Sequence, residues 1–513
     1  MKKTNMLKIH VDFSGSRDSF FVTYHLVCDF FMGMRKGEKS MKLYFDVADK
    51  PKFRQLIAFA FQQMLAIMAA TIAVPMIVGH GLSPAAAMLG AGMGTIVYIL
   101  LTKRKSPVFV GSSFAFIKSM LAAFAGGVSM SLGWLGLIIG AALAGLVYVI
   151  LGIAVKVAGV KWLNKLMPAV VIGPTVAIIG LSLAGSAISD IVKGDVVREI
   201  TEYSVSLTGG TPEIVEQTGT QMVGSPWIAL LCGLVTLFVT MLCSTYGKKT
   251  VKLIPFIIGI LSGYTVAAVL TAIGSACGID TLKIIDFSVF PKYMLAEGFS
   301  IKTFFSIPEM TFLKAFGALN ELSWSYVLTI LVAYVPVAFV AFTEHIADHK
   351  NLSSIIGHEL LEEPGLHRTL LGDGIGSAVG AFFGGCPNTT YGESVACVAL
   401  TGNASITTII ATAILCILSS FITPAVAFVD SIPPCVMGGV CIALYGFIAV
   451  SGLKMIQAVD LSENKNLYVV STILIVGIGG LELTIGAVTL TEIASALILG
   501  IIANVVLSYK KEK

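Results

Sequence analysis

Apolar stretches of about 20 residues recur along this chain, and short polar or Gly- and Pro-containing segments separate them. A helix needs a stretch of this length to cross the hydrocarbon core of a bilayer. Three stretches, at 108–125, 369–384 and 387–401, are short or interrupted by Gly and Pro. The pattern predicts an all-α polytopic membrane protein. Its fourteen expected spans lie near 56–79, 85–101, 108–125, 132–155, 167–188, 226–246, 251–273, 325–347, 369–384, 387–401, 404–428, 433–451, 467–481 and 491–508.

Composition supports a lipid-facing surface. Of the 513 residues, 56% are hydrophobic and 12% are charged, whereas a soluble domain has about a quarter of its residues charged. The lipid bilayer is therefore an expected partner, and the net charge of +4 is too small to indicate nucleic acid. The nine cysteines show no CxxC spacing, which favours buried thiols over disulfides or metal ligands. Residues 1–50 differ from the rest, and we interpret them as an extension, either disordered or preceding a start at Met41.

Lysine and arginine positions predict the orientation of the spans. Basic residues follow spans two, four, six, eight, twelve and fourteen, whereas the short connections at 80–84, 126–131, 429–432 and 482–490 contain none. Basic loops stay on the cytoplasmic side. Both termini are therefore expected in the cytoplasm of a bacterial cell, with the protein in the inner (plasma) membrane. The basic residues are Lys103, Arg104, Lys105, Lys156, Lys161, Lys165, Lys248, Lys249, Lys252, Lys350, Arg368, Lys454, Lys465, Lys510, Lys511 and Lys513.

The two halves of the chain resemble each other. Pro168 and Gly173 open the fifth span, and Pro433 and Gly438 open the twelfth with the same spacing. The broken third and tenth spans also hold corresponding places in spans 1–7 and 8–14. Because seven is odd, such repeats must have opposite orientations. Inverted repeats with matching interrupted helices are typical of secondary transporters, whose substrate site lies near the bilayer midplane.

Few ionisable residues fall inside the predicted spans, and each costs at least ~2.5 kcal/mol to insert. The short list of candidates is Lys118, Glu344, His345, Asp348, Asp373 and Glu393. Glu344 and Asp348 are four residues apart and share a helical face. They are either titratable carboxylates facing a substrate cavity or groups at the cytoplasmic end of span eight. His345 and His349 have metal-ligand spacing, but no further cluster completes a site, so we expect no metal.

The interrupted segments carry the candidate chemistry. Residues 384–393 are rich in turn-forming types and end at Glu393, which we place near the first turn of a half-helix, where the dipole stabilises a carboxylate. Residues 111–116 form a similar break. Irregular backbone at membrane depth survives only where protein or water satisfies it. Two facing breaks would supply N–H donors, aromatic faces and carboxylate acceptors, which a flat heterocycle with alternating C=O and N–H edges requires.

At these residues the chain resembles the nucleobase–ascorbate transporter family, specifically its bacterial uracil permease branch. The resemblance runs from about residue 50 to the C-terminus. It rests on residues 62–75, 111–117, 344–345, 364–368, 387–393 and 434–439.

The resemblance implies two inverted seven-span repeats, with short strands in spans three and ten. It implies a core domain at about 51–165 and 325–430, and a gate domain at about 166–324 and 431–509. It also implies a carrier rather than an enzyme, with no cofactor beyond a coupling ion, H⁺, and it is compatible with a homodimer. The implied substrate-binding residues are Glu344, Glu393, Phe114, Tyr391, Gly392, Ala70 and Thr71; the implied proton-coupling residues are Glu344 and Asp348.

The chain departs from the family pattern at several positions. Ser394, Ala396 and Gly402 stand where Asn, Gly and Arg are usual. Gln63 and Asp348 each replace a His, and Lys118 replaces a small polar residue. One hypothesis is that Lys118 and Asp348 form a replacement ion pair.

The function we expect is uracil import by proton symport. A xanthine or other purine permease of the same family is the nearest alternative, and Gly402 leans that way. A related anion carrier is a second alternative, which the intramembrane glutamates disfavour. An intramembrane metal-dependent enzyme would need His345, His349 and Asp348 around a metal, and the sequence has no P-loop for an ATP-driven pump.

Overall fold

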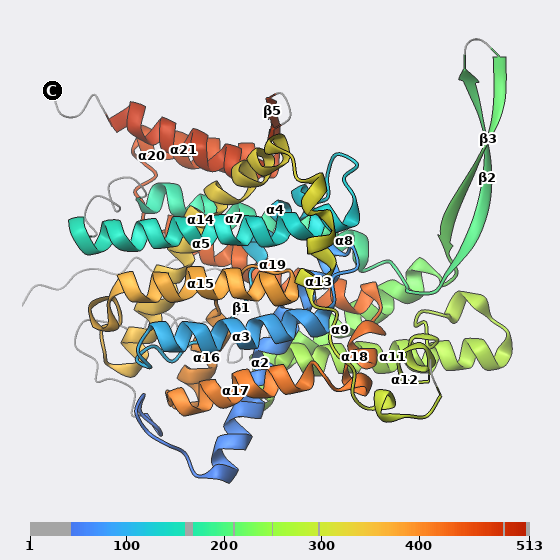
Figure 1. The fold of residues 1–513 in the computed structure, drawn as a ribbon, viewed down its shortest axis with the longest axis horizontal. Coiled ribbons are helices and arrows are strands. Elements are labelled where there is room, and N and C mark those ends of the chain that lie inside the picture. The colour runs from blue at the N-terminus through green and yellow to red at the C-terminus, as the bar shows by residue number, and fades with distance from the viewer. Residues whose placement is uncertain are drawn as a thin grey trace, which may run out of the picture. The chain divides into compact units, whose positions relative to one another are not determined.

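The computed structural model describes residues 43–159, 168–208, 211–248, 250–295, 298–485 and 488–508, most of them helical (Figure 1). Residues 1–42 lie outside the described residues. In the first half, the helices and strands are α2 (Phe53–Val78), α3 (Pro84–Leu101), β1 (Val110–Ser112), α4 (Ile117–Ala123), α5 (Met130–Ala158), α7 (Ala169–Ser182), α8 (Ala184–Asp190), β2 (Val197–Thr208), β3 (Thr211–Met222), α9 (Pro226–Tyr246), α10 (Thr250–Leu253), α11 (Pro255–Cys277) and α12 (Val289–Met294). In the second half they are α13 (Thr311–Ala315), α14 (Trp324–Ile356), α15 (Leu366–Gly384), β4 (Asn388–Thr390), α16 (Gly392–Thr401), α17 (Ile406–Ser419), α18 (Thr423–Asp430), α19 (Pro434–Ile456), α20 (Asn464–Ile478), β5 (Leu483–Ile485), β6 (Val488–Leu490) and α21 (Glu492–Ser508).

Eight helical segments in the described part of the chain are long and apolar enough to cross a membrane, and shorter apolar helices accompany them. The chain is thus a multi-pass, mostly helical membrane protein, as the hydrophobic pattern predicts.

Sequence-local signals fix where several helices begin. Ser83, Ser129 and Ser323 each accept a hydrogen bond from the backbone N–H three residues later, and so cap α3, α5 and α14.

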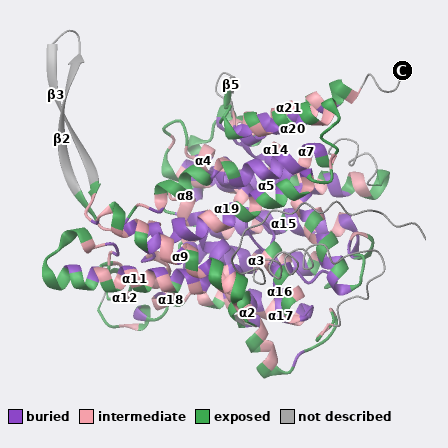
Figure 2. Ribbon diagram, turned by 180° about the vertical axis from the view of Figure 1, so that it is seen from behind, coloured by how far each residue is buried: buried purple, intermediate pink, exposed green. Residues whose placement is uncertain are grey.

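Helix α15 lies between α3 and α5, and glycine makes this close approach possible (Figure 1). A Cβ on Gly90 of α3 would lie 2.4 Å from the carbonyl oxygen of Gly380 in α15. A Cβ on Gly145 of α5 would lie 2.5 Å from the carbonyl oxygen of Gly374. Small residues let membrane helices approach until their backbones touch. Buried residues gather along α5, α14 and α15 (Figure 2).

A second group of helices packs mainly among its own members. Helix α19 packs on α7 and α9, α9 packs on α11, and α20 packs on α7 and α21. Helix α14 contacts α4 and α5, and it also contacts α7 and α21 of this second group. It therefore lies between the two groups of helices.

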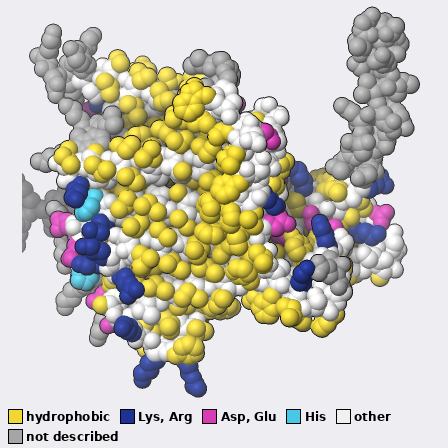
Figure 3. Space-filling view, in the orientation of Figure 1, with side chains coloured by type: hydrophobic (Ala, Val, Ile, Leu, Met, Phe, Trp, Pro, Cys, Tyr) yellow, Lys and Arg dark blue, Asp and Glu magenta, His cyan; other side chains and the backbone are white. Residues whose placement is uncertain are grey.

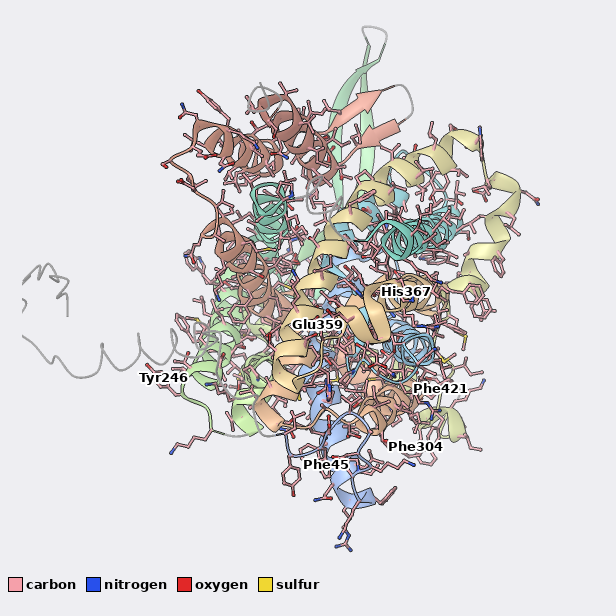
Figure 4. The ribbon with its side chains drawn as sticks, turned by 90° about the vertical axis from the view of Figure 1, so that its left-hand side faces the viewer. Phe45, Tyr246, Phe304, Glu359, His367 and Phe421 are labelled. Carbon is pink, nitrogen blue, oxygen red and sulfur yellow. The ribbon has the colours of Figure 1, made fainter. Side chains whose placement is uncertain are left out.

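Two loops tie distant parts of the chain together. The backbone N–H groups of Tyr44 and Phe45 both donate to the carbonyl oxygen of Gly402, at 2.7 and 3.1 Å. At another turn, Ser306 N–H donates to the carbonyl of Phe421, and Thr423 N–H donates to that of Phe304 (Figure 4). Residues 43–49 therefore belong structurally with the helices that follow them.

Helix α14 differs from the predicted span at 325–347. It starts at Trp324 and continues to Ile356, so the helix does not end at Glu344 or Asp348. Hydropathy falls at these residues, but the backbone hydrogen bonds that define a helix do not depend on side-chain polarity. Both carboxylates are half-buried, one turn apart, within a continuous helix.

Candidate functional site

Two short strands, one from each half of the sequence, form the centre of the candidate site. β1 pairs antiparallel with β4, with Val110 opposite Thr390 and Ser112 opposite Asn388. Two further hydrogen bonds extend the pair, from Ser113 N–H to Pro387 O and from Tyr391 N–H to Phe109 O. The short strands expected in the broken third and tenth stretches are therefore present, and their backbone groups satisfy one another, as a low-dielectric environment requires.

A short helix follows each strand. A single 3₁₀ turn, Phe114–Phe116, leads from β1 into α4, and α16 begins at Gly392 directly after β4. The first N–H groups of a helix have no intrahelical partner and carry partial positive charge. The backbone at Phe114 and Gly392 thus provides donors at the place where the two strands meet.

Tyr391 joins the strands to α2. Its hydroxyl donates to the carbonyl of Ser112 at 2.9 Å and lies 3.3 Å from the Thr71 hydroxyl. A Cβ on Gly111 would lie 2.6 Å from the Tyr391 ring, so only glycine leaves room for the ring there. Ala70 and Thr71 are both buried in α2. The predicted residues Thr71 and Tyr391 are therefore in direct contact.

Phe114 approaches the second group of helices. Its half-buried ring packs edge-on against Tyr445 of α19, with 6.0 Å between centroids. The sequence predicted Phe114 as a site residue but gave no sign of this neighbour. Tyr445 is 331 residues away along the chain and belongs to a different group of helices.

Three carboxylates lie around the strand pair. Glu344 and Asp348 come from α14, and Glu393 comes from the first turn of α16, which packs on α14. All three are half-buried. Asp348 Oδ2 accepts a hydrogen bond from Thr390 Oγ at 2.8 Å, and its other oxygen lies 3.6 Å from where a Cβ on Gly392 would be. The arrangement brings acidic side chains to the starts of the half-helices.

A fully buried polar network lies behind β4, and the sequence did not predict it. Asp373 Oδ2 is 2.8 Å from His345 Nδ1 and 3.4 Å from Thr389 Oγ, and His345 Nε2 is 3.0 Å from Thr369 Oγ. Asp373 was visible as an ionisable residue in a predicted span. Its partners His345 and Thr389 were not, because they come from two other segments, α14 and β4.

His345 and His349 do not face a common ligand. His349 Nδ1 lies 2.8 Å from the carbonyl of His345, and its Nε2 lies 2.7 Å from the Tyr98 hydroxyl. Both ring nitrogens of each histidine thus engage protein groups. Among the described residues, no group of three His, Cys, Asp or Glu could hold a metal ion. The helical spacing that suggested a metal serves these hydrogen bonds instead.

Gln63 and Ser394, two of the unusual positions, contact each other. Gln63 Nε2 donates to Ser394 Oγ at 2.6 Å, and this oxygen also accepts from Phe109 N–H at 3.0 Å. The contact fixes α16 to α2 and to the residue just before β1. Both side chains are buried.

The hypothesis that Lys118 pairs with Asp348 is wrong. Lys118 Nζ lies 3.2 Å from Glu492 Oε1 in α21, whereas Asp348 bonds to Thr390. Glu492 follows the last short hairpin, 374 residues after Lys118, and lay outside our set of intramembrane ionisable groups.

Sequence comparison decides the family. A family model described as Permease family matches residues 54–215 and 214–486, which is most of the chain. This chain belongs to that family. The permease is 36% identical to the uracil permease of Bacillus caldolyticus over 467 residues, which cover 90% of this chain and 94% of that protein.

Two further relatives agree. The uracil permease of Bacillus subtilis (strain 168) is 33% identical, over 92% of this chain and 97% of its own. That of Escherichia coli (strain K12) is also 33% identical, over 89% of this chain and 92% of its own. The predicted membership in the nucleobase–ascorbate transporter family, uracil permease branch, is confirmed. The predicted class, a transporter and not an enzyme, is confirmed with it.

Solved structures share the fold at much lower identity. The murine Solute Carrier 26 family member A9 anion transporter matches with a TM-score of 0.57 and 12% identity, covering 98% of this permease and 77% of that chain. The transmembrane domain of the cyanobacterial bicarbonate transporter BicA matches with a TM-score of 0.55 and 15% identity, covering 90% and 100%. At these identities the likeness concerns the fold alone.

Proposed function

We propose that this permease imports uracil across the plasma membrane by proton symport. The observation that carries the proposal is the meeting of β1 and β4 beside the carboxylates of Glu344 and Glu393. Uracil presents two carbonyl oxygens and two ring N–H groups that alternate around part of a flat ring. Backbone N–H groups at the half-helix starts would bind the oxygens, and the carboxylates would accept from the ring N–H groups.

Proton coupling follows from the carboxylates on α14. An ionised, unpaired carboxylate is expensive to enclose in a closed site, whereas a protonated one is neutral and can still hydrogen-bond. We assign this role to Glu344, with Asp348 held in place by Thr390. Proton and substrate would then enter the closed site together.

Transport would proceed by alternating access between two bodies. The core would comprise residues of about 51–165 and 325–430, and the gate those of about 166–324 and 431–509. The separate packing of α7, α9, α11 and α19–α21 supports this division. The described residues contain eight long apolar helical segments and five shorter apolar helices, and α15 brings the number to fourteen. Two inverted repeats of seven spans would need this number.

The orientation remains the predicted one, with both termini in the cytoplasm. On the face shown in Figure 3, hydrophobic side chains cover the middle; Lys, Arg and His side chains gather along the left-hand edge, and further Lys and Arg side chains lie among Asp and Glu at the right. A basic edge beside an apolar belt is what the cytoplasmic side of a membrane protein presents. The homodimer also remains a prediction.

Gly402 no longer favours a purine permease over a uracil permease. It takes a positive φ of 65° as the C-terminal cap of α16, and its carbonyl accepts from Tyr44 and Phe45. A left-handed cap favours glycine whatever the substrate. The glycine is therefore explained by backbone geometry.

Uptake of labelled uracil in transport-deficient cells tests the proposal directly. We expect uracil to accumulate, an uncoupler to abolish the accumulation, and excess unlabelled xanthine to compete poorly. Preferential uptake of labelled xanthine would move the assignment to the purine branch. Uracil accumulation that persists with the uncoupler would overturn the proton coupling.

A further inference from the structure

Lys118 and Glu492 form an ion pair deep in the protein that the substrate site does not use. The Lys118 side chain is 30% exposed, and that of Glu492 is 4% exposed. The second carboxylate oxygen of Glu492 is buried and makes no hydrogen bond within the described residues. Glu492 is therefore a nearly enclosed carboxylate whose one ionic partner in the described chain is Lys118.

The two partners belong to different groups of helices. Lys118 is in α4, which is fixed to α14 because Ser119 Oγ donates to the carbonyl of Ala333 at 2.7 Å and Tyr326 donates to that of Ala123. Glu492 opens α21, which packs on α20 and α7. Five helices make the main contacts with α4 and α21, namely α2, α5, α7, α14 and α20, and α14 is the one that contacts both. The ion pair therefore crosses the boundary between the proposed core and gate.

The local structure fixes the position of Glu492. Thr491 accepts hydrogen bonds at the start of α21, from Ala494 N–H to its hydroxyl and from Ser495 N–H to its carbonyl. The Glu492 carboxylate thus lies in the first helical turn, at the positive end of the helix dipole. The helix dipole stabilises a carboxylate at this position, but a buried charge also needs a counter-ion.

We propose that Lys118–Glu492 is an ionic latch between core and gate, which holds the permease in the conformation seen here and must open in each transport cycle. This proposal rests on the proposed alternating access. When the two bodies move apart, Lys118 can reach water, whereas Glu492 loses its counter-ion. The latch therefore sets the equilibrium ratio between the conformation seen here and the one in which core and gate have moved apart. It also sets the rate of exchange between these two conformations.

Thiol labelling reports how often the boundary between core and gate opens, and it requires no substrate. Ser495 is buried one turn along α21 from Glu492, and its hydroxyl has no hydrogen-bond partner in the described residues. Ser495→Cys introduces a thiol that a membrane-impermeant maleimide can reach only when the boundary opens. The exposed native Cys277 provides the reference for labelling, read by peptide mass spectrometry.

The informative variant neutralises both charges at once. In the Ser495→Cys background, Lys118→Met with Glu492→Gln removes the attraction but leaves no buried unpaired charge. We expect labelling at position 495 to rise about five-fold or more, the shift that a modest interaction energy produces in a two-state equilibrium. The exchanged pair, Lys118→Glu with Glu492→Lys, should return labelling toward the wild-type value, while either single exchange should not.

A matched ion pair inside the gate supplies the control. Lys193 and Asp190 also lie 3.2 Å apart, but both belong to one segment. Lys193→Met with Asp190→Asn should leave labelling at position 495 unchanged. Unchanged labelling in the Lys118→Met, Glu492→Gln protein, with normal uracil uptake, would overturn the latch. A wild-type protein that takes up no uracil would refute the proposed function and leave this labelling result intact.

Discussion

Single side chains explain why the proposed substrate site has a defined shape. The Tyr391 hydroxyl bridges the Ser112 carbonyl and the Thr71 hydroxyl, so one residue fixes a strand and a helix from the first half of the chain. Its ring occupies the space left by Gly111. Removing the hydroxyl would leave the buried Ser112 carbonyl with one partner fewer, which typically costs about 1–3 kcal/mol.

Tyr391→Phe should therefore weaken uracil binding while the protein still folds. We expect the Kd for uracil, measured by calorimetry or ligand-induced stabilisation in detergent, to rise about ten-fold, as a loss near 1.4 kcal/mol implies. Thr71→Val should reproduce part of the effect, since it removes the other end of the bridge. Binding of wild-type strength in Tyr391→Phe would show that the bridge does not shape the site.

Glu344→Gln tests the proton role separately from binding. Glutamine keeps a polar, neutral side chain, so we expect uracil exchange across the membrane to continue, while accumulation against a gradient is lost. The measurement compares counterflow with proton-driven uptake in vesicles. Glu359→Gln, at an exposed position beyond the end of α14, is the control and should transport normally. Full proton-driven accumulation by Glu344→Gln would assign the proton to another group.

At the scale of elements, backbone contact between α3 and α15 holds the proposed core together. Gly90→Ala would place a methyl carbon 2.4 Å from the carbonyl oxygen of Gly380, which is backbone and cannot move aside alone. We expect a fall of several degrees in Tm by fluorescence-monitored unfolding. Gly446→Ala in α19 is the matched control, because nothing lies within 4 Å of a Cβ there. A Tm for Gly90→Ala equal to that of Gly446→Ala would mean that the helices can separate at no cost.

Much of the fold at this scale could be predicted, because long apolar runs and serine caps are local signals. The broken spans were also predictable, since Gly, Pro and Ser cluster at 111–113 and 384–388, whereas the strands within them were expected only from the family resemblance. The extent of α14 was not, because polarity changes at Glu344 while the helix continues to Ile356. The partners of Asp373 and Lys118 were not predictable either. They are contacts between distant segments, and no local pattern in one sequence specifies them.

At the scale of the whole molecule, acidic side chains of different segments meet away from the membrane-spanning helices. Burial, together with the nearby charges of Asp286 and Asp430, raises the pKa of Asp195 to about 6. Asp430 also accepts a hydrogen bond from Tyr293. The ionised Asp195 is therefore disfavoured in the folded protein relative to the unfolded chain.

This pKa gives stability a definite pH dependence. Because the folded-state pKa lies above the ordinary value near 4, the contribution of Asp195 is most favourable at low pH and is lost as pH rises from about 4 to about 6. Asp195→Asn should therefore raise Tm at pH 7.5 and have little effect at pH 4. Asp460→Asn is a control of opposite sign, since hydrogen bonds from Ser462 lower the Asp460 pKa. An equal change in Tm at both pH values would contradict the assignment to Asp195.

The pairing of β1 with β4 also bears on how the permease is made. Residues 110–112 reach the bilayer long before residues 388–390 leave the ribosome, and until then the edge of β1 has no protein partner. Exposed peptide groups are not stable in hydrocarbon, so the nascent first half must shelter this segment in water, in the translocon or against a chaperone. Fragments ending before residue 388 should consequently be degraded, whereas two co-expressed fragments divided in a loop should reassemble into a stable protein.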